Sequence, residues 1–139
     1  MASRATYPIP HMTRLVRRVH AKVHEEALGM NSKQVYLLAT LEDRGALPQQ
    51  NLCDTLRTTQ NTIVTWLNEL EEAGYVERVR DPNDRRKHNV ALTRAGHLAL
   101  ERAERELLRL EDEVLAALSA DERAQLRKLL AKALAVPPL

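Results

Sequence analysis

Apolar residues recur at intervals of three and four along most of the chain, which is the spacing of a helix with one buried face. The first such run predicts a helix at about 10–28, with Gly29 as its C-terminal cap. Its apolar positions are Met12, Leu15, Val16, Val19, Val23 and Ala27. Asn31, followed three residues later by Gln34, resembles a capping box and predicts a second helix that ends near Gly45.

Two shorter helical runs follow, with only residues 57–59 between them. Pro48 can begin the first of these helices, and Thr59 can cap the second, which should stop at Gly74. The residues expected to face inward are Leu52, Leu56, Ile63, Trp66, Leu67 and Leu70. Two short helices joined by so short a turn predict a helix-turn-helix.

The apolar period then shortens from that of a helix to that of a strand. Residues 75–80 and 88–92 are short and extended, and the turn-forming stretch 81–84 lies between them. This pattern predicts a β-hairpin directly after the helix-turn-helix.

Two more helices are expected after the hairpin. Thr93 should open a long helix at about 94–118. Its apolar positions are Leu100, Leu107, Leu108, Val114, Leu115 and Leu118. Ser119 and Glu122 form another capping box, and Pro137 should end the last helix. The expected fold is mainly α with a small β hairpin.

The second helix of the predicted helix-turn-helix begins with side chains that are small or amide-bearing and uncharged. In the major groove of DNA, Gln or Asn can bind adenine with two hydrogen bonds, and the free amides of a helix start attract phosphates. The candidate base-reading residues are Thr59, Gln60, Asn61, Thr62 and Thr65. On this helix alone, an ordinary solvated helix start remains an equal alternative.

The hairpin favours nucleic acid because its charge is locally unbalanced. The chain has a net charge of only +2, yet residues 78–87 hold five basic side chains against two acidic ones. A basic hairpin beside a helix-turn-helix is a wing, which can reach phosphates or insert arginine into the minor groove. The basic candidates are Arg78, Arg80, Arg85, Arg86 and Lys87.

Composition narrows the class of protein further. A chain of 139 residues fits one domain with a real core, and its single cysteine, Cys53, suggests a reducing compartment. No apolar run could span a bilayer and no signal peptide is evident, so we expect a cytoplasmic protein without a membrane partner. Without a phosphate-binding glycine loop or a nucleophile beside a base, we expect neither an enzyme nor a cofactor.

The run from Leu47 to Gly96 resembles the winged helix-turn-helix of the MarR (multiple-antibiotic-resistance regulator) family. The motif that carries the resemblance is Asp81-Pro82, then Asp84-Arg85-Arg86, then Leu92-Thr93 and Gly96. The flanking helices match the plan of the family over about residues 10–135. The resemblance implies one domain over 1–139, with dimerisation helices at about 10–30 and 94–135 and the winged helix-turn-helix at about 31–93.

The resemblance also implies a function. Members of the family are homodimeric regulators, usually repressors, that bind pseudo-palindromic double-stranded DNA, here at the nucleoid of a bacterial or archaeal cell. The wing arginine of the family corresponds to Arg86, with Arg85 as the other candidate, and the aspartate that helps to hold it corresponds to Asp84. Many members release DNA when a small aromatic or phenolic ligand binds, and His11 and Tyr36 are the candidate pocket residues here.

The apolar ends of the chain favour a homodimer on separate grounds. The stripe of the last helix is too wide for one contact in so small a chain, so burial against a second copy is the simpler solution. The alternative is packing back onto the long helix of the same chain. The expected interface residues are Leu15, Val16, Leu126, Leu129, Leu130 and Leu134.

Two alternatives to a ligand-responsive repressor stay open. A winged-helix adaptor for proteins would predict a neutral wing and an apolar recognition face. A metal- or redox-sensing regulator would use His20 and His24, spaced four apart, or Cys53. Two histidines do not make a metal site, and Cys53 is expected to be a buried, inert thiol, so no metal is expected.

Overall fold

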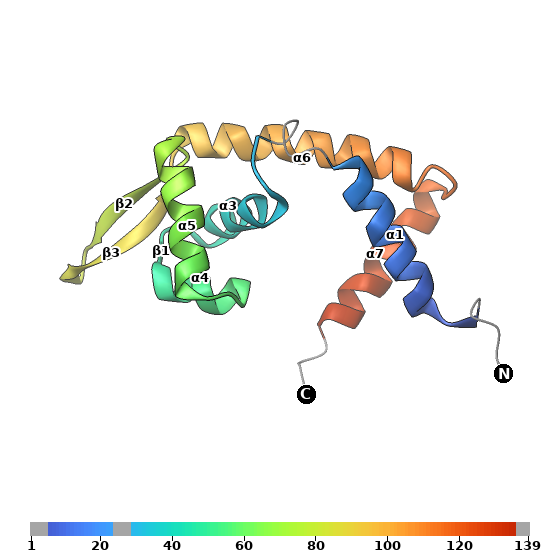
Figure 1. Cartoon of the computed structure of the whole chain (residues 1–139), viewed down its shortest axis with the longest axis horizontal. Helices are drawn as coiled ribbons and strands as arrows, with labels where there is room; N and C mark the ends of the chain where they lie inside the picture. The colour runs from blue at the N-terminus through green and yellow to red at the C-terminus, as the bar shows by residue number, and fades with distance from the viewer. Residues whose placement is uncertain (1–5, 24–28, 136–139) are drawn as a thin grey trace. The chain divides into compact units, whose positions relative to one another are not determined.

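The computed structural model describes residues 6–23 and 29–135, and the chain forms two compact units. One unit is Met1–Val23 with Leu107–Leu139, and the other is His24–Glu106. The elements, labelled in Figure 1, are α1 (Pro8–Lys22), α3 (Ser32–Arg44), β1 (Leu47–Pro48), α4 (Gln49–Leu56), α5 (Gln60–Glu72), β2 (Val76–Asp81), β3 (Asp84–Leu92), α6 (Arg94–Val114) and α7 (Ala120–Leu134). Helix α6 begins in the second unit and ends in the first.

The unit His24–Glu106 contains the fully enclosed core of the described chain. Its largest fully buried side chains are Leu37, Leu38, Leu52, Ile63, Leu67 and Leu70. They come from α3, α4 and α5, and each contributes roughly 1.5–3 kcal/mol relative to an exposed position. Because these buried side chains hold one face of α4 and α5 against the core, the polar residues on the opposite faces of the two helices are turned outward.

Local chemistry explains where these helices begin and end. Asn31 Oδ1 accepts a hydrogen bond from the backbone N–H of Gln34 at 2.8 Å, and Gln34 Oε1 accepts one from the backbone N–H of Asn31 at 3.1 Å. Helix α5 ends at Glu72, and Gly74 follows with a φ of 79°, a left-handed value that favours glycine. The capping box and the glycine stop are both as predicted.

The sheet has three antiparallel strands in the order β1-β3-β2. Strands β2 and β3 form the predicted hairpin, although β3 begins at Asp84 and not at residue 88. The two-residue strand β1 pairs Leu47 with Val90 and Pro48 with Asn89. A proline is tolerated there because an edge strand can leave one side of its backbone unpaired. The sequence did not predict β1, since two residues carry no period.

The unit with α1, the end of α6 and α7 is more open. Among its described residues, Leu110 and Val114 of α6 are buried, whereas α1 and α7 bury none of theirs fully. Ion pairs join the helices: Lys22 Nζ lies 3.1 Å from Glu113 Oε2, and Arg123 Nη1 lies 2.5 Å from Asp112 Oδ1. Apolar surface is left on α1 and α7, where Val16 and Leu134 are exposed.

Two predicted helix ends were wrong. Helix α1 ends at Lys22 because Val23 is extended, with φ −76° and ψ 109°. The predicted positions 24–28, including Ala27, lie outside the described residues. Helix α6 ends at Val114 and not at 118. An apolar side chain continues a helical stripe whether or not its backbone stays helical, so periodicity missed both breaks.

Two predicted packing positions were also wrong in part. Leu108 is 62% exposed, whereas Ala99, Ala103 and Leu110 form the buried stripe of α6 with Leu100 and Val114. Small alanines allow close approach, which a search for large apolar residues overlooks. Trp66 is only half-buried, and the Lys33 ammonium lies 5.8 Å from its ring centroid. The large indole ring of Trp66 fits because it lies at the edge of the core and not inside it.

Within the described residues, none of the helices has both the length and the apolar character needed to cross a membrane.

A candidate nucleic-acid interface

Helices α4 and α5 are joined by the tight turn that the sequence predicts. Arg57 adopts a left-handed conformation with φ 49° and ψ 52°, and the Thr58 amide donates to the Cys53 carbonyl oxygen at 3.1 Å. Thr59 then caps α5, because its Oγ1 accepts from the Thr62 amide at 3.3 Å. The result is a helix-turn-helix with α5 as its second helix.

The polar start of α5 faces away from the core. Ile63, Leu67 and Leu70 fill the buried side of this helix. Of the predicted base-reading residues, Thr59, Gln60, Asn61 and Thr65 are exposed and Thr62 is half-buried. The predicted set therefore lies on one accessible end of the helix, where the unpaired amides carry a partial positive charge.

The hydroxyl groups in this set already have partners. The Thr65 hydroxyl donates to the Asn61 carbonyl oxygen at 3.0 Å, and the hydroxyls of Thr59 and Thr62 lie 3.0 Å apart. The side-chain amide of Asn61 has no hydrogen-bond partner in the described part of the chain. The side-chain amide of Asn61 is therefore the least engaged of these base-reading groups on α5.

The acidic end of α5 is tied to the protein. Glu69 Oε2 accepts a hydrogen bond from Gln34 Nε2 at 2.6 Å, and Glu71 Oε2 lies 3.4 Å from Arg78 Nε. The second contact joins the start of the wing to α5. Arg78, predicted as a DNA contact, is thus engaged in an ion pair, and Arg80 is exposed.

Three basic residues occupy an irregularity in the hairpin. The register pairs Arg80 with His88 and then Asp81 with Asp84, so Arg85, Arg86 and Lys87 have no partners on β2. Extra residues of this kind form a bulge that bends the strand and aims its side chains outward.

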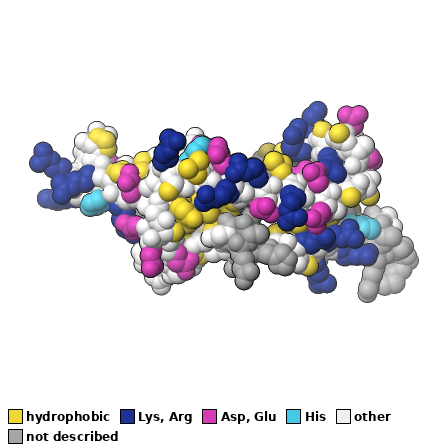
Figure 2. Space-filling model, turned by 90° about the horizontal axis from the view of Figure 1, so that it is seen from above, with side chains coloured by type: hydrophobic (Ala, Val, Ile, Leu, Met, Phe, Trp, Pro, Cys, Tyr) yellow, Lys and Arg dark blue, Asp and Glu magenta, His cyan; other side chains and the backbone are white. Residues whose placement is uncertain are grey.

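All three side chains are exposed, and no described acidic group lies within ion-pair distance of them. Lys and Arg side chains gather at the tip of the hairpin, the left end of Figure 2. Asp84 Oδ1 accepts from the Arg86 backbone amide at 3.0 Å, so this aspartate shapes the bulge and leaves the guanidinium free of its carboxylate.

The end of the wing motif, Thr93 and Gly96, is structural. Thr93 Oγ1 donates to the Gly74 carbonyl oxygen at 2.6 Å and accepts from the Gly96 amide at 3.0 Å. The Thr93 amide donates to the Tyr75 carbonyl oxygen at 3.1 Å. These bonds fasten the first turn of α6 to the chain that enters β2, so Thr93 and Gly96 hold the wing in place.

His97 links two helices of the same unit through exposed carboxylates. Its Nδ1 lies 2.9 Å from Glu42 Oε1 on α3, and its Nε2 lies 3.3 Å from Glu101 Oε1. The hydrogen bond to Glu42, then the charges of Glu42 and Glu101, raise the pKa of His97 above its ordinary value of 6.5. The imidazolium is therefore the form that these contacts favour.

This raised pKa makes the stability of the unit depend on pH. The contribution of a group with a raised folded pKa is present below the unfolded pKa and is lost as pH rises through the folded pKa. We expect His97→Gln to lower the melting temperature more at about pH 5.5 than at about pH 8.5. Thermal unfolding at both pH values measures this, with His88→Gln as the control. An equal loss at both values would contradict it.

The other candidate sensing residues form no site in the part of the chain that the structure describes. Cys53 is buried, and this burial raises the pKa of its thiol, which disfavours the reactive thiolate. His20 is exposed on α1, and its predicted companion His24 lies outside the described residues. No group of three possible metal ligands occurs in residues 6–23 and 29–135.

The predicted dimer and pocket residues lie on accessible surface. Val16, Leu129, Leu130 and Leu134 are exposed, and Leu15 and Leu126 are half-buried. His11 lies with Arg14, Leu15 and Arg18 around a shallow hollow on α1. Tyr36 is exposed on α3, in the other unit. The grouping of His11 with Tyr36 stays a prediction.

Sequence reasoning missed the glutamines next to the recognition helix. Gln49 and Gln50 begin α4, and both contact Gln60 at the start of α5. The only signal was a glutamine pair at the start of the first helix of a helix-turn-helix. Spacing alone could not show that the tight turn brings these residues to Gln60.

Comparisons with known proteins agree with this geometry. The profile of the MarR family matches residues 30–88. The HTH-type transcriptional regulator YdgJ of Bacillus subtilis is 31% identical over 117 residues, which are 84% of this chain and 71% of YdgJ. The HTH-type regulator PecS of Dickeya dadantii is 30% identical over 106 residues, 74% of this chain and only 64% of PecS. The PcaV transcriptional regulator of Streptomyces coelicolor, solved with its natural ligand, superposes with a TM-score of 0.71 at 27% identity, over 98% of this chain and 97% of PcaV.

Proposed function

The chain belongs to the MarR family, and we propose that it is a homodimeric repressor that binds operator DNA and is released by a small-molecule ligand. This family consists of transcriptional regulators and not of enzymes. The observation that carries the proposal is the exposed basic bulge Arg85–Lys87 in the same compact unit as the polar start of α5. Because its partner is genomic DNA, the proposed location is the cytoplasm of a bacterial or archaeal cell, at the nucleoid.

The two surfaces suit two different features of DNA. The start of α5 presents amide groups and a helix N-terminus, which fit base edges and phosphates in the major groove. The bulge presents Arg85 and Arg86 on a narrow hairpin, which fits the minor groove, where the negative potential is enhanced. Helix α5 also contacts β2, so the recognition helix and the wing are held together.

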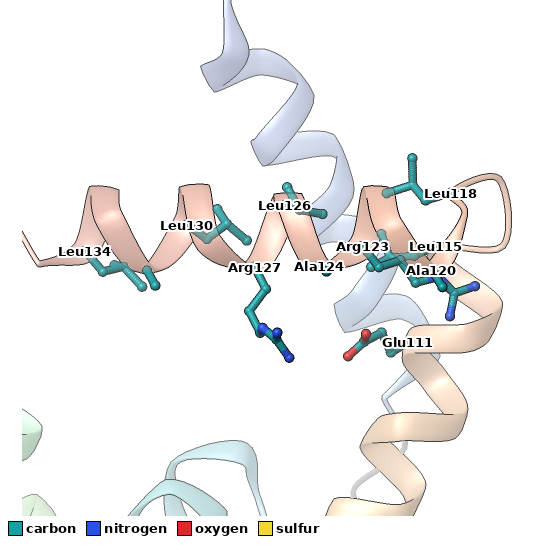
Figure 3. A pocket seen from close by; sticks show the side chains of 11 residues that line it. Glu111, Leu115, Leu118, Ala120, Arg123, Ala124, Leu126, Arg127, Leu130 and Leu134 are labelled. Atoms are coloured by element: carbon teal, nitrogen blue, oxygen red, sulfur yellow. The ribbon is translucent and has the colours of Figure 1, made fainter.

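The apolar surface of α7 supports the homodimer. A groove of about 830 Å³ runs along α7 beside the last turn of α6, lined by Leu115, Leu118, Leu126, Leu130 and Leu134 among others (Figure 3). Leu134 is 84% exposed and Leu129 is 60% exposed in the single chain. Burial of this surface against a second copy would place two winged helix-turn-helices on a pseudo-palindromic site.

Leu130→Glu should convert the proposed dimer into monomers. The carboxylate would have to leave water for a surface formed mainly by leucines, at a cost of several kcal/mol. Analytical ultracentrifugation measures the change, and operator affinity should fall with it. Gln125→Glu adds the same charge to an exposed position of α7 and should leave the dimer intact. A dimeric Leu130→Glu protein would refute this interface.

The effector is proposed to be a small aromatic or phenolic molecule. The PcaV structure, which was solved with its natural ligand and covers 98% of this chain, supports a small-molecule effector, and the aromatic class comes from the family resemblance. His11 and Tyr36 are the proposed contact residues. A panel of phenolic acids that release the protein from DNA would identify the class. Release that His11→Ala and Tyr36→Ala leave unchanged would exclude these two residues.

The adaptor and sensor alternatives have weaker support. An adaptor needs a neutral wing, whereas the bulge holds three exposed cations with no acidic partner among the described residues. A redox sensor needs an accessible thiolate, and the Cys53 thiol is 4% exposed.

Binding across a salt series tests the proposed function. We expect one upstream palindrome to bind tightly, with two subunits per site, and affinity to fall steeply with salt. The slope should be roughly −0.9 in log–log units for each phosphate that the protein neutralises. Weak binding that is equal for all DNA, from protein freed of any bound effector, would reject the repressor.

A further inference from the structure

Four side chains on α4 and α5 form a chain of hydrogen bonds with one direction. Gln49 Nε2 donates to Gln60 Oε1 at 3.0 Å, and Gln60 Nε2 donates to Gln50 Oε1. Gln50 Nε2 then donates to Asp54 Oδ1 at 3.1 Å. Gln49 and Gln50 are the first two residues of α4, and Gln60 is the first of α5.

The direction of this chain is set at one end. An ionised carboxylate only accepts hydrogen bonds, whereas each glutamine amide can donate from nitrogen or accept at oxygen. Asp54 can therefore only accept a hydrogen bond from the side-chain nitrogen of Gln50. The side-chain oxygen of Gln50 is then turned toward Gln60. Gln60 must then donate its own nitrogen to Gln50 and turn its oxygen toward Gln49.

This chain of hydrogen bonds leaves the side-chain amide of Gln60 able to bind the edge of a base. Its oxygen accepts one hydrogen bond from Gln49 and keeps a second lone pair, and its nitrogen keeps a second N–H. Adenine needs one acceptor and one donor from an amide in the major groove. Because oxygen and nitrogen are held in a fixed order, Gln60 presents one pattern of donor and acceptor along the groove and not its reverse.

We propose that Asp54 is a positioning residue for DNA recognition, which fixes the amide of Gln60 through Gln50 and so determines the base pair that Gln60 prefers. The proposal rests on the proposed function, since it concerns how the same surface selects its operator. Asp54 itself carries a negative charge and is unsuited to contact phosphates. Its part is to orient a neighbour, and the bond that it accepts is charge-assisted and so about twice as strong as a neutral one.

Three variants separate orientation from charge. Asp54→Asn keeps the shape but can donate or accept, so the Gln50 and Gln60 amides are free to reverse. Asp43→Asn removes the same charge from an exposed position of α3. The double variant Gln50→Glu with Asp54→Asn has the charge of the original protein and again places an acceptor-only carboxylate against Gln60, so it should restore the original direction.

The experiment is selection from duplexes with a randomised stretch two helical turns long. We expect Asp54→Asn to reduce the preference at one base pair of each half-site by roughly fivefold or more. Asp43→Asn should return the original motif, and the double variant should recover the lost preference. An unchanged motif for Asp54→Asn, or no recovery in the double variant, would overturn the proposal.

A measurement without DNA distinguishes this proposal from the proposed function. In the free protein, the side-chain NH₂ resonances of Gln50 and Gln60 should both move in Asp54→Asn. In the double variant, which has no amide at position 50, the resonances of Gln60 should return. Unmoved resonances would overturn the hydrogen-bond chain. If the original protein selects no motif while the resonances behave as expected, the proposed function fails, but the chain of hydrogen bonds from Asp54 to Gln60 is still supported.

Discussion

Gly96→Ala should strongly destabilise the unit that carries the wing. A methyl group on Gly96 would lie 2.0 Å from the Tyr75 carbonyl oxygen and 2.7 Å from a methyl carbon of Leu92. The oxygen belongs to the backbone and accepts the hydrogen bond from Thr93, so it cannot move aside cheaply. We expect a loss of about 3 kcal/mol in the free energy of unfolding, measured by urea denaturation.

Gly74→Ala is the matched control for this prediction. Gly74 has a φ of 79° but open space around its added carbon, so its replacement costs only backbone strain, about 1 kcal/mol. A loss for Gly96→Ala no greater than that for Gly74→Ala would mean that α6 can shift away from Tyr75. In that case the first turn of α6 would not fix the position of the wing.

Arg86→Ala should have the largest effect on DNA binding among the wing substitutions. Arg86 is exposed in the bulge, its backbone amide is held by Asp84, and its guanidinium has no acidic partner among the described residues. Each half-site would lose one arginine in the minor groove. We expect operator affinity to fall roughly tenfold or more, mainly at A·T-rich positions, in a titration at fixed salt.

Two further variants show whether the effect belongs to the position. Arg102→Ala removes the same side chain from an exposed site on α6 and should change affinity little. Arg86→Lys keeps the charge and should recover only part of the affinity, because the narrow minor groove favours arginine. Equal losses for Arg86→Ala and Arg102→Ala would show that only net charge matters.

The sequence predicts those parts of the fold that local chemistry determines. The capping boxes at Asn31 and Ser119 begin α3 and α7 where expected, because the cap and its partner are three residues apart in the chain. Thr59 caps α5 for the same reason. The family profile and the superposed regulators then confirm the winged helix-turn-helix.

The features that escaped prediction depend on residues brought together by folding. Strand β1 exists only because Leu47 meets Val90, and the glutamines of α4 meet Gln60 only through the tight turn. For the candidate site, residue types predicted the basic wing and the polar helix start. They could not show that Arg78 pairs with Glu71, since that contact joins separate elements.

Because of the bulge in the wing, the length of the hairpin can change without a change in the register of its strands. Strand pairs from Val76 with Leu92 to Arg80 with His88 share one register, and residues 85–87 lie outside it. An insertion, a deletion or a change of charge at these positions would leave those pairs unchanged. During evolution, the reach and charge of the hairpin can therefore vary with the operator while the domain that carries it keeps its fold.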